Sequence, residues 1–154
     1  MRLAVINGPN LNLLGRREPE IYGRTTLAEI EKRLESLASG LGVEIEFFQS
    51  NGEGELIDFV QSAAARVDGF VVNAGGLTHT SVALQDALVG VGRPYVEVHL
   101  SNLSAREPVR QHSLLTAKAR GMVMGFGADS YTLAVRGLVA SLRPEGEDRT
   151  AAGS

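Results

Sequence analysis

Short apolar segments alternate along this chain with longer segments in which apolar residues recur every three or four positions. The short segments occupy residues 3–6, 43–48, 70–72, 95–100 and 122–124. Each has the length of a β-strand, and turn-forming residues lie beside most of them. The longer segments, at 27–41, 56–65, 81–88 and 131–142, have the spacing of amphipathic helices. Alternation of this kind is typical of α/β proteins with a parallel sheet.

Local sequence features predict where one helix begins, which strand lies at the edge of the sheet and where the structure is irregular. Thr26 followed by Glu29 has the form of a capping box, so we expect a helix to begin there. The 43–48 segment alternates apolar and acidic residues, which is typical of an edge strand. Residues 104–112 are polar and contain a proline, so we expect irregular structure there before a helical piece at 114–119. The whole predicts a flavodoxin-like, doubly wound, five-stranded parallel sheet with helices on both faces.

The size and composition of the chain exclude several classes of protein. With 154 residues we expect one α/β domain over 1–142, followed by a disordered polar tail over 143–154. There is no cysteine, which excludes disulfides, thiolate nucleophiles and cysteine-ligated metals. A net charge of −3 disfavours nucleic acid as a partner, and the first apolar run is too short to span a membrane. We therefore expect a cytoplasmic protein that binds neither.

Polar residues gather where three of the predicted strands end. They are Asn7, Asn10, Asn73, Thr78, His79, Glu97, His99 and Ser101. Because ligands of doubly wound sheets bind at the carboxyl ends of the strands, a polar site is expected at this edge. Taken alone, Asn7 or Gly75 is more often a turn-forming residue, and a lone histidine such as His99 is as often a core residue as a catalyst. The position of His99 at the end of a strand favours catalysis.

Two arginine-containing segments are further candidates. Residues 15–23 carry Arg17 and Tyr22 between glycines, which is typical of a mobile lid, although composition alone slightly favours a solvated basic loop. Arg106 and Arg110 lie four residues apart and can form a surface pair. An arginine beside the fourth strand can also bind a hydroxyl or a carboxylate.

Several chemistries lack their necessary residues. The chain has two lysines, and Lys32 lies opposite the apolar face of its predicted helix, so a lysine imine is not expected. The three histidines lack the spacing of a zinc site. The glycine-rich motifs of serine hydrolases, dinucleotide enzymes and P-loop enzymes are missing from the sequence. We therefore expect no metal and no cofactor.

Longer motifs connect these candidates to a known family. They are residues 7–15 (NGPNLNLLG), 17–19, 22–23, 49–51 (QSN), 53–58 (EGELID), 73–81 (NAGGLTHTS) and 97–102 (EVHLSN). Over residues 1–142 the chain resembles the type II 3-dehydroquinate dehydratases. It departs from the family at Gly52, where a histidine is expected, at Gln111, where a basic residue is common, and at Ser130, where glycine is usual.

The resemblance implies a lyase that converts 3-dehydroquinate to 3-dehydroshikimate through an enolate, in the shikimate pathway of aromatic amino acid biosynthesis. It implies that Tyr22 is the base as a phenolate, that Arg17 stabilises the negative charge, and that Asn10 supports the enolate oxygen with a bound water. His99 would be the general acid, oriented by Glu97.

The resemblance also implies substrate contacts and an assembly. The residues that would hold the substrate are Asn73, His79, Asp86, Leu100, Ser101 and Arg110. Trimers would pack into a homo-oligomeric dodecamer, with Asp86 serving or bridging sites across subunits. No cofactor is implied.

Rival interpretations come from other classes. A phosphoacceptor receiver has the same alternating pattern, but it needs acidic residues and a lysine where this chain has Asn7, Asn73 and Gly125. A flavin carrier needs a serine- and threonine-rich phosphate loop, which the first loop lacks. A role in quinate breakdown uses the same reaction and stays open.

Overall fold

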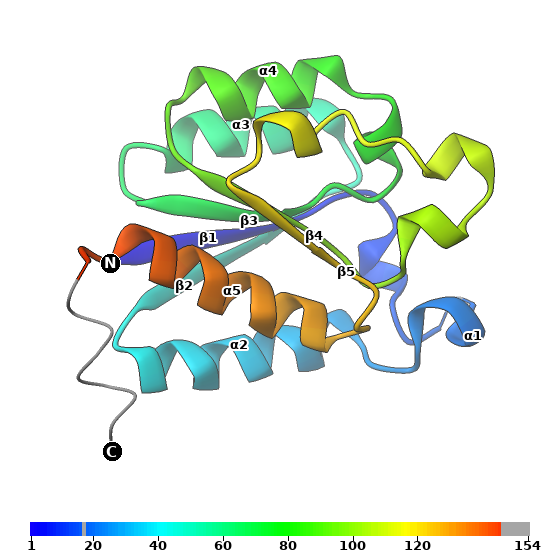
Figure 1. The fold of residues 1–154 in the computed structure, drawn as a ribbon, viewed down its shortest axis with the longest axis horizontal. Helices are drawn as coiled ribbons and strands as arrows, with labels where there is room; N and C mark the ends of the chain where they lie inside the picture. Colours follow the sequence, from blue (N-terminus) through cyan, green and yellow to red (C-terminus); the bar gives the residue numbers. More distant parts are fainter. Residues whose placement is uncertain (17, 146–154) are drawn as a thin grey trace.

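A parallel five-stranded sheet forms the centre of the molecule (Figure 1). The structure is a computed structural model that describes residues 1–16 and 18–145, and of Tyr22 only the backbone. The strands are β1 (Arg2–Asn7), β2 (Glu44–Gln49), β3 (Gly69–Asn73), β4 (Tyr95–His99) and β5 (Gly121–Met124). Their order is β2-β1-β3-β4-β5. The predicted flavodoxin-like α/β fold is thereby confirmed.

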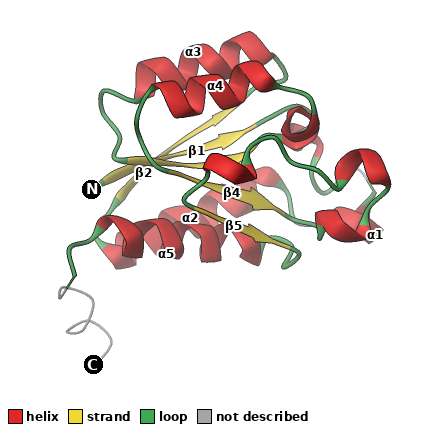
Figure 2. Cartoon of the chain, turned by 45° about the horizontal axis from the view of Figure 1, so that its top comes forward, coloured by secondary structure: helices red, strands yellow, loops and turns green. Residues whose placement is uncertain are grey.

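Helices cover both faces of this sheet (Figure 2). The longer ones are α2 (Leu27–Leu41), α3 (Glu53–Ala63), α4 (Val82–Gly90) and α5 (Asp129–Leu142). Along β1, Leu3 and Val5 pack in the core on the side of α2 and α5, whereas Ala4 and Ile6 pack on the side of α3 and α4. Side chains of a strand alternate between faces, so a continuous apolar run is the pattern of a strand buried on both.

Two local predictions are confirmed. The Thr26 hydroxyl accepts a hydrogen bond from the Glu29 backbone N–H at 3.2 Å, and helix α2 begins at the next residue. Strand β2 lies at the edge of the sheet and is half-buried, as its alternating sequence predicts. Its Phe48 ring stacks on Phe59 of α3, which covers part of that edge.

The boundaries of other elements differ from the prediction. Helix α3 begins at Glu53, three residues before the predicted start, because Gly52 caps it and two glutamates stabilise its first turn. The predicted helical piece at 114–119 is only a 3₁₀ turn, Thr116–Lys118. A short helix α1 (Pro19–Tyr22) lies within the predicted lid. In the part of the chain that is described, no helix is long and apolar enough to cross a membrane. Most of the predicted tail, 146–154, lies outside the described residues.

Gly8 holds the loop after β1 against the loop after β3. Its N–H donates to the Asn73 carbonyl at 2.8 Å, and a Cβ at this position would lie 2.3 Å from the Ala74 carbonyl oxygen. The Gly8→Ala substitution is therefore expected to lower the free energy of unfolding by about 1–3 kcal/mol, measured by urea denaturation.

Gly40 provides the matched control for this substitution. It lies in α2, and a Cβ at this position would have no atom outside the local helix backbone within 4 Å, so Gly40→Ala is expected to stabilise the protein by about 0.5–1 kcal/mol. Equal effects of the two substitutions would contradict the close approach at Gly8.

Candidate active site

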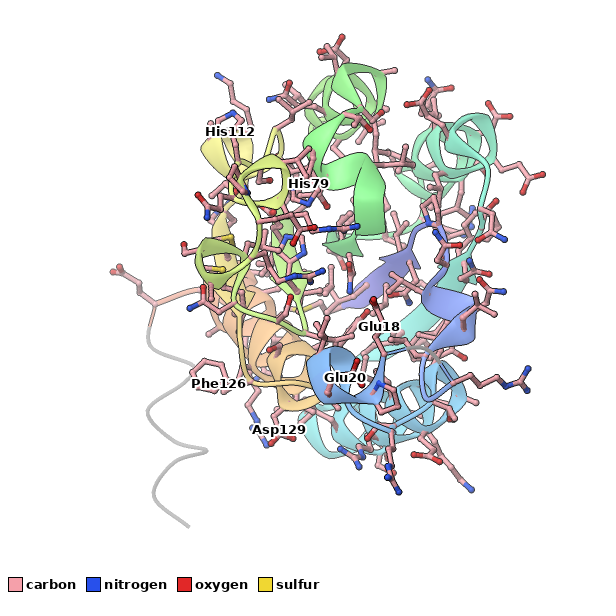
Figure 3. All side chains as sticks on the ribbon, turned by 90° about the vertical axis from the view of Figure 1, so that its right-hand side faces the viewer. Glu18, Glu20, His79, His112, Phe126 and Asp129 are labelled. Carbon is pink, nitrogen blue, oxygen red and sulfur yellow. The ribbon has the colours of Figure 1, made fainter. Side chains whose placement is uncertain are left out.

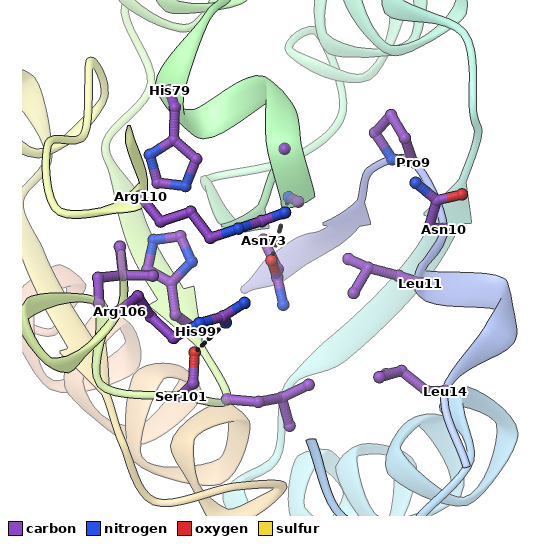
Figure 4. A pocket seen from close by; sticks show the side chains of 14 residues that line it. Pro9, Asn10, Leu11, Leu14, Asn73, His79, His99, Ser101, Arg106 and Arg110 are labelled. Carbon is purple, nitrogen blue, oxygen red and sulfur yellow. Dashed lines mark hydrogen bonds between the residues drawn. The ribbon is translucent and has the colours of Figure 1, made fainter. Parts of the chain in front are cut away.

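A pocket opens at the carboxyl ends of the strands, where the polar residues were expected. Its cavity volume is about 100 Å³, enough for several water molecules or one small ligand. The predicted site residues that line it are Asn10, Asn73, His79, His99, Leu100, Ser101 and Arg110. Figure 4 shows the histidines and arginines on one side of the pocket and Leu11 and Leu14 on the other. The sheet edge thus brings together three loops that are far apart in sequence.

The loop after β1 holds Asn10 in an unusual backbone conformation. Asn10 has a φ of +70°, in the left-handed region that asparagine tolerates better than most residues. Its N–H donates to Asn51 Oδ1 at 2.9 Å. Gln49 Nε2 donates to the same oxygen at 3.2 Å and to the Gly8 carbonyl at 3.2 Å. Gln49 at the end of β2 and Asn51 just after it therefore fix the loop that carries Asn10.

A buried tyrosine joins the ends of β1 and β3. The Tyr131 hydroxyl donates to Asn7 Oδ1 at 2.6 Å and accepts from Asn73 Nδ2 at 2.9 Å. Asn73 Oδ1 accepts from the Gly75 N–H at 3.2 Å. This network sets the orientation of the Asn73 amide in the pocket. Asn7 is buried and does not line the pocket, so its side chain has a structural part here.

Burial raises the pKa of both tyrosines that the core contains. It brings the pKa of Tyr95 to about 12, with the negative charge of Glu97 adding to the effect. Burial also raises the pKa of Tyr131 and outweighs the hydrogen bond from Asn73, which lowers it. Neither phenol is suited to act as a phenolate near neutral pH.

These shifts predict a loss of stability at alkaline pH. A tyrosine titrates near ~10 in the unfolded chain, so the stability from keeping Tyr95 and Tyr131 neutral is fully present below that pH. It falls as the pH rises from about 10 towards the folded pKa of about 12. We expect tyrosinate absorbance and far-ultraviolet circular dichroism to change together in this range. Ionisation of all the tyrosines in a protein that stays folded would contradict the shifts.

His99 and Glu97 form a buried hydrogen-bonded pair at the end of β4. His99 Nε2 lies 2.5 Å from Glu97 Oε2, and Glu97 is fully buried. Burial alone would raise the pKa of Glu97, but hydrogen bonds from His99, Thr116 and Ser113 together hold it below its usual value. With Nε2 bound to the carboxylate, Nδ1 is the ring nitrogen that His99 can offer to a ligand.

A backbone carbonyl group sets the tautomer of His79. Its Nδ1 lies 2.8 Å from the His112 carbonyl oxygen, which can only accept, so Nδ1 carries a hydrogen. In the neutral ring Nε2 is then an acceptor. His79 can therefore accept a hydrogen bond from a ligand hydroxyl.

Arg106 and Arg110 both line the pocket, although the family resemblance implies a substrate contact for Arg110 alone. Arg106 Nη1 donates to Ser101 Oγ at 3.1 Å (Figure 4). Arg110 Nε donates to Glu107 Oε1 at 2.5 Å. The spacing of Arg106 and Arg110 alone cannot distinguish a surface pair from a binding pair, so the place of Arg106 in the pocket lining could not be predicted from the sequence. Two guanidinium groups in the lining favour an anionic ligand.

Besides Glu97, three predicted site residues either do not line the pocket or lie outside the described residues. Asp86 is exposed on α4 and does not line the pocket. Arg17 and the side chain of Tyr22 lie outside the described residues. Helix α1, whose last residue is Tyr22, lies on the same side of the molecule as the pocket (Figures 1 and 3). Across residues 1–16 and 18–145, no group of three His, Asp or Glu side chains is arranged to hold a metal ion.

The comparison with known families decides what this pocket belongs to. A family model described as dehydroquinase class II matches residues 1–139. The chain belongs to the class II dehydroquinase family. The resemblance inferred from the sequence motifs is thereby confirmed, and the chain is an enzyme.

Relatives from different organisms support this membership. The chain is 57% identical over 143 residues to a 3-dehydroquinate dehydratase of Prochlorococcus marinus, covering 93% of this chain and 99% of the relative. It is 52% identical over 141 residues to catabolic 3-dehydroquinase 1 of Aspergillus terreus, covering 92% and 93%. The crystal structure of a type II dehydroquinase from Butyrivibrio crossotus has a TM-score of 0.88 at 39% identity and covers 90% of this chain and 97% of its own.

Proposed function

We propose that this class II dehydroquinase dehydrates 3-dehydroquinate to 3-dehydroshikimate through an enolate intermediate. The observation that carries the proposal is the buried pair of Glu97 and His99, which presents one imidazole nitrogen to a pocket that also contains two arginines. His99 in this pair can act as a general acid and protonate a hydroxyl that leaves as water. The two guanidinium groups can bind the carboxylate of a substrate.

In this mechanism, Tyr22 removes a proton next to the ketone and the electron pair forms an enolate. Asn10, with a water, supports the enolate oxygen, and Arg17 stabilises the negative charge. The enolate then collapses, the carbon–hydroxyl bond breaks, and His99 Nδ1 donates a proton so that water leaves. The role of Tyr22 as the base rests on the family resemblance. Tyr95 and Tyr131, the other tyrosines of the chain, are unsuited to this role because they are buried with raised pKa values.

The remaining lining residues hold the substrate. Asn73 and His79 bind hydroxyls, since the amide has spare hydrogen-bonding capacity and His79 Nε2 is an acceptor. The backbone N–H groups of Leu100 and Ser101 face the carboxylate, with Arg110 beside them. No metal or cofactor takes part.

The test is to supply 3-dehydroquinate to the purified enzyme and follow the conjugated enone product in the ultraviolet. Turnover that survives a chelator is expected. A folded protein that gives no absorbance change would refute the proposal. Loss of turnover with the chelator would refute the metal-free mechanism.

We place the reaction in the shikimate pathway in the cytoplasm, with quinate breakdown as the second candidate. The name of the Prochlorococcus relative gives no pathway, whereas the name of the Aspergillus relative says catabolic. The pathway therefore needs its own experiment. Deletion of the gene should cause a requirement for aromatic amino acids. Failure to grow on quinate without that requirement would favour the catabolic role.

For the assembly, we propose trimers that pack into a dodecamer. Val82, Asp86 and Val89 follow one another at spacings of four and three on α4, and both valines are about half exposed. An exposed apolar face with a carboxylate at its centre suits contact with a neighbouring copy, where Asp86 serves or bridges its site. A fully active monomer in light scattering would refute this.

A further inference from the structure

Two hydroxyl groups in the connection between β4 and β5 bind the carboxylate that orients His99. Ser113 Oγ donates to Glu97 Oε2 at 2.7 Å, and Thr116 Oγ1 donates to Glu97 Oε1 at 2.5 Å. We propose that Ser113 and Thr116 are positioning residues that keep Glu97 ionised and so keep the shared proton on the His99 imidazole. The part of this proposal that concerns turnover rests on the function proposed above.

Hydrogen bonds and burial of the segment around Leu115 hold the hydroxyl groups of Ser113 and Thr116 in place. Ser113 Oγ accepts from the Leu115 N–H at 3.0 Å, which leaves its hydrogen directed to Glu97. Leu115 is fully buried, and its carbonyl accepts from the Tyr95 hydroxyl. The two hydroxyls therefore flank a residue that is fixed in the core, and their reach to Glu97 does not depend on a mobile loop.

The surroundings of Glu97 otherwise disfavour a negative charge. Val72 on β3 and Met122 on β5 are its neighbours across the sheet, and neither carries a charge. Among the described residues, the titratable groups that interact with it are His99 and Tyr95 on its own strand. An ionised carboxylate is costly in such a place unless hydrogen bonds satisfy both of its oxygens. His99 reaches only Oε2, so the Thr116 hydroxyl is what satisfies Oε1.

The acidity of the His99 Nδ1–H group depends on whether the shared proton lies on His99 or on Glu97. When Glu97 is ionised, a protonated His99 is an imidazolium and its Nδ1–H is a competent acid. If Glu97 takes the proton instead, the pair becomes a carboxylic acid and a neutral imidazole. The Nδ1–H of a neutral imidazole is a far weaker acid. Losing the hydroxyl donors would thus slow the loss of the substrate hydroxyl without changing any lining residue.

Two substitutions of Thr116 distinguish a packing role from a hydrogen-bonding role, because the two roles predict opposite effects on kcat. Thr116→Val keeps the shape and removes the hydroxyl, whereas Thr116→Ser keeps the hydroxyl and removes a methyl group. We expect Thr116→Val to lower kcat by about tenfold or more with little change in KM, as for the loss of a hydrogen bond to a charged group. Thr116→Ser should stay within about threefold of wild type. A merely structural role predicts the reverse order, and that result would overturn the proposal.

A second measurement needs no turnover. The carboxyl ¹³C resonance of Glu97 should titrate at a higher pH in Thr116→Val and in Ser113→Ala than in the wild type, and at an unchanged pH in Thr116→Ser. Equal titration in all four proteins would overturn the proposal. If wild-type enzyme does not act on 3-dehydroquinate, the proposed function fails while this titration still decides the part played by the hydroxyls. Should Thr116→Val fail to fold, Ser113→Ala carries the same comparison with Ser113→Thr as its control.

Discussion

Replacing Tyr22 with phenylalanine is expected to lower kcat about a thousandfold while leaving substrate affinity nearly unchanged, because the phenol is the proposed base and general base catalysis has this magnitude. Tyr95 and Tyr131 cannot substitute for it, since burial raises the pKa of both. Single-turnover kinetics and calorimetric titration with substrate measure the two quantities separately.

The expected loss also depends on how Tyr22 becomes ionised. A free tyrosine with a pKa near ~10 is only about a thousandth ionised at neutral pH, so about 4 kcal/mol must favour the phenolate. An exposed ion pair supplies about 0–1 kcal/mol, which is not enough. We therefore expect closure of the 15–23 segment to exclude water and bring Arg17 to the phenolate, and Arg17→Ala to lower kcat as well.

A matched control separates this effect from loss of the fold. Ile30→Val removes one buried methylene group from the core face of α2 and is expected to lower the melting temperature with a much smaller effect on kcat. Tyr22→Phe should do the opposite. Near-normal kcat in Tyr22→Phe would mean that another group is the base, with His99 the next candidate.

His99→Ala is expected to lower kcat by about two to four orders of magnitude, because the leaving hydroxyl then departs without an acid. Removing the ring also leaves Glu97 buried without one of its three donors, so some loss of stability accompanies the kinetic effect. Steady-state kinetics and thermal unfolding of the same preparation give both values.

His79→Ala is the contrasting variant, because His79 is proposed to bind a hydroxyl and not to transfer a proton. It should raise KM more than it lowers kcat. A substrate analogue whose leaving group needs no proton should be slowed much less by His99→Ala than the natural substrate. Equal slowing of both substrates would show that His99 is not the acid.

Much of the fold could be predicted because its strands and longer helices have apolar residues at regular spacings. The β1 run from Leu3 to Ile6 and the helix pattern beginning at Thr26 contain enough periodic positions to be recognised without any neighbour in space. Helix α1 has four residues and no period, and the 3₁₀ turn at 116–118 has three, so neither leaves a signal of this kind.

The candidate site was predictable where it lies at strand ends. Glu97 and His99 are two residues apart on one strand, so they share a face, and their pairing could be anticipated. Ser113 and Thr116 could not be found in this way, because they reach Glu97 only through the irregular connection after β4. Asp86 is exposed on α4 and does not line the pocket, and its proposed contact with a neighbouring copy leaves no pattern within one chain.

The hydroxyl of Tyr131 has a consequence for the protein during its synthesis. Asn7 and Asn73 both bind this hydroxyl, and it lies on α5, 124 residues after Asn7. While the ribosome still holds α5, the nascent chain already contains the ends of β1 and β3, but the bond that orients the Asn73 amide cannot form. The proposed substrate site is therefore complete only when the last helix has emerged and docked, however early the sheet begins to assemble.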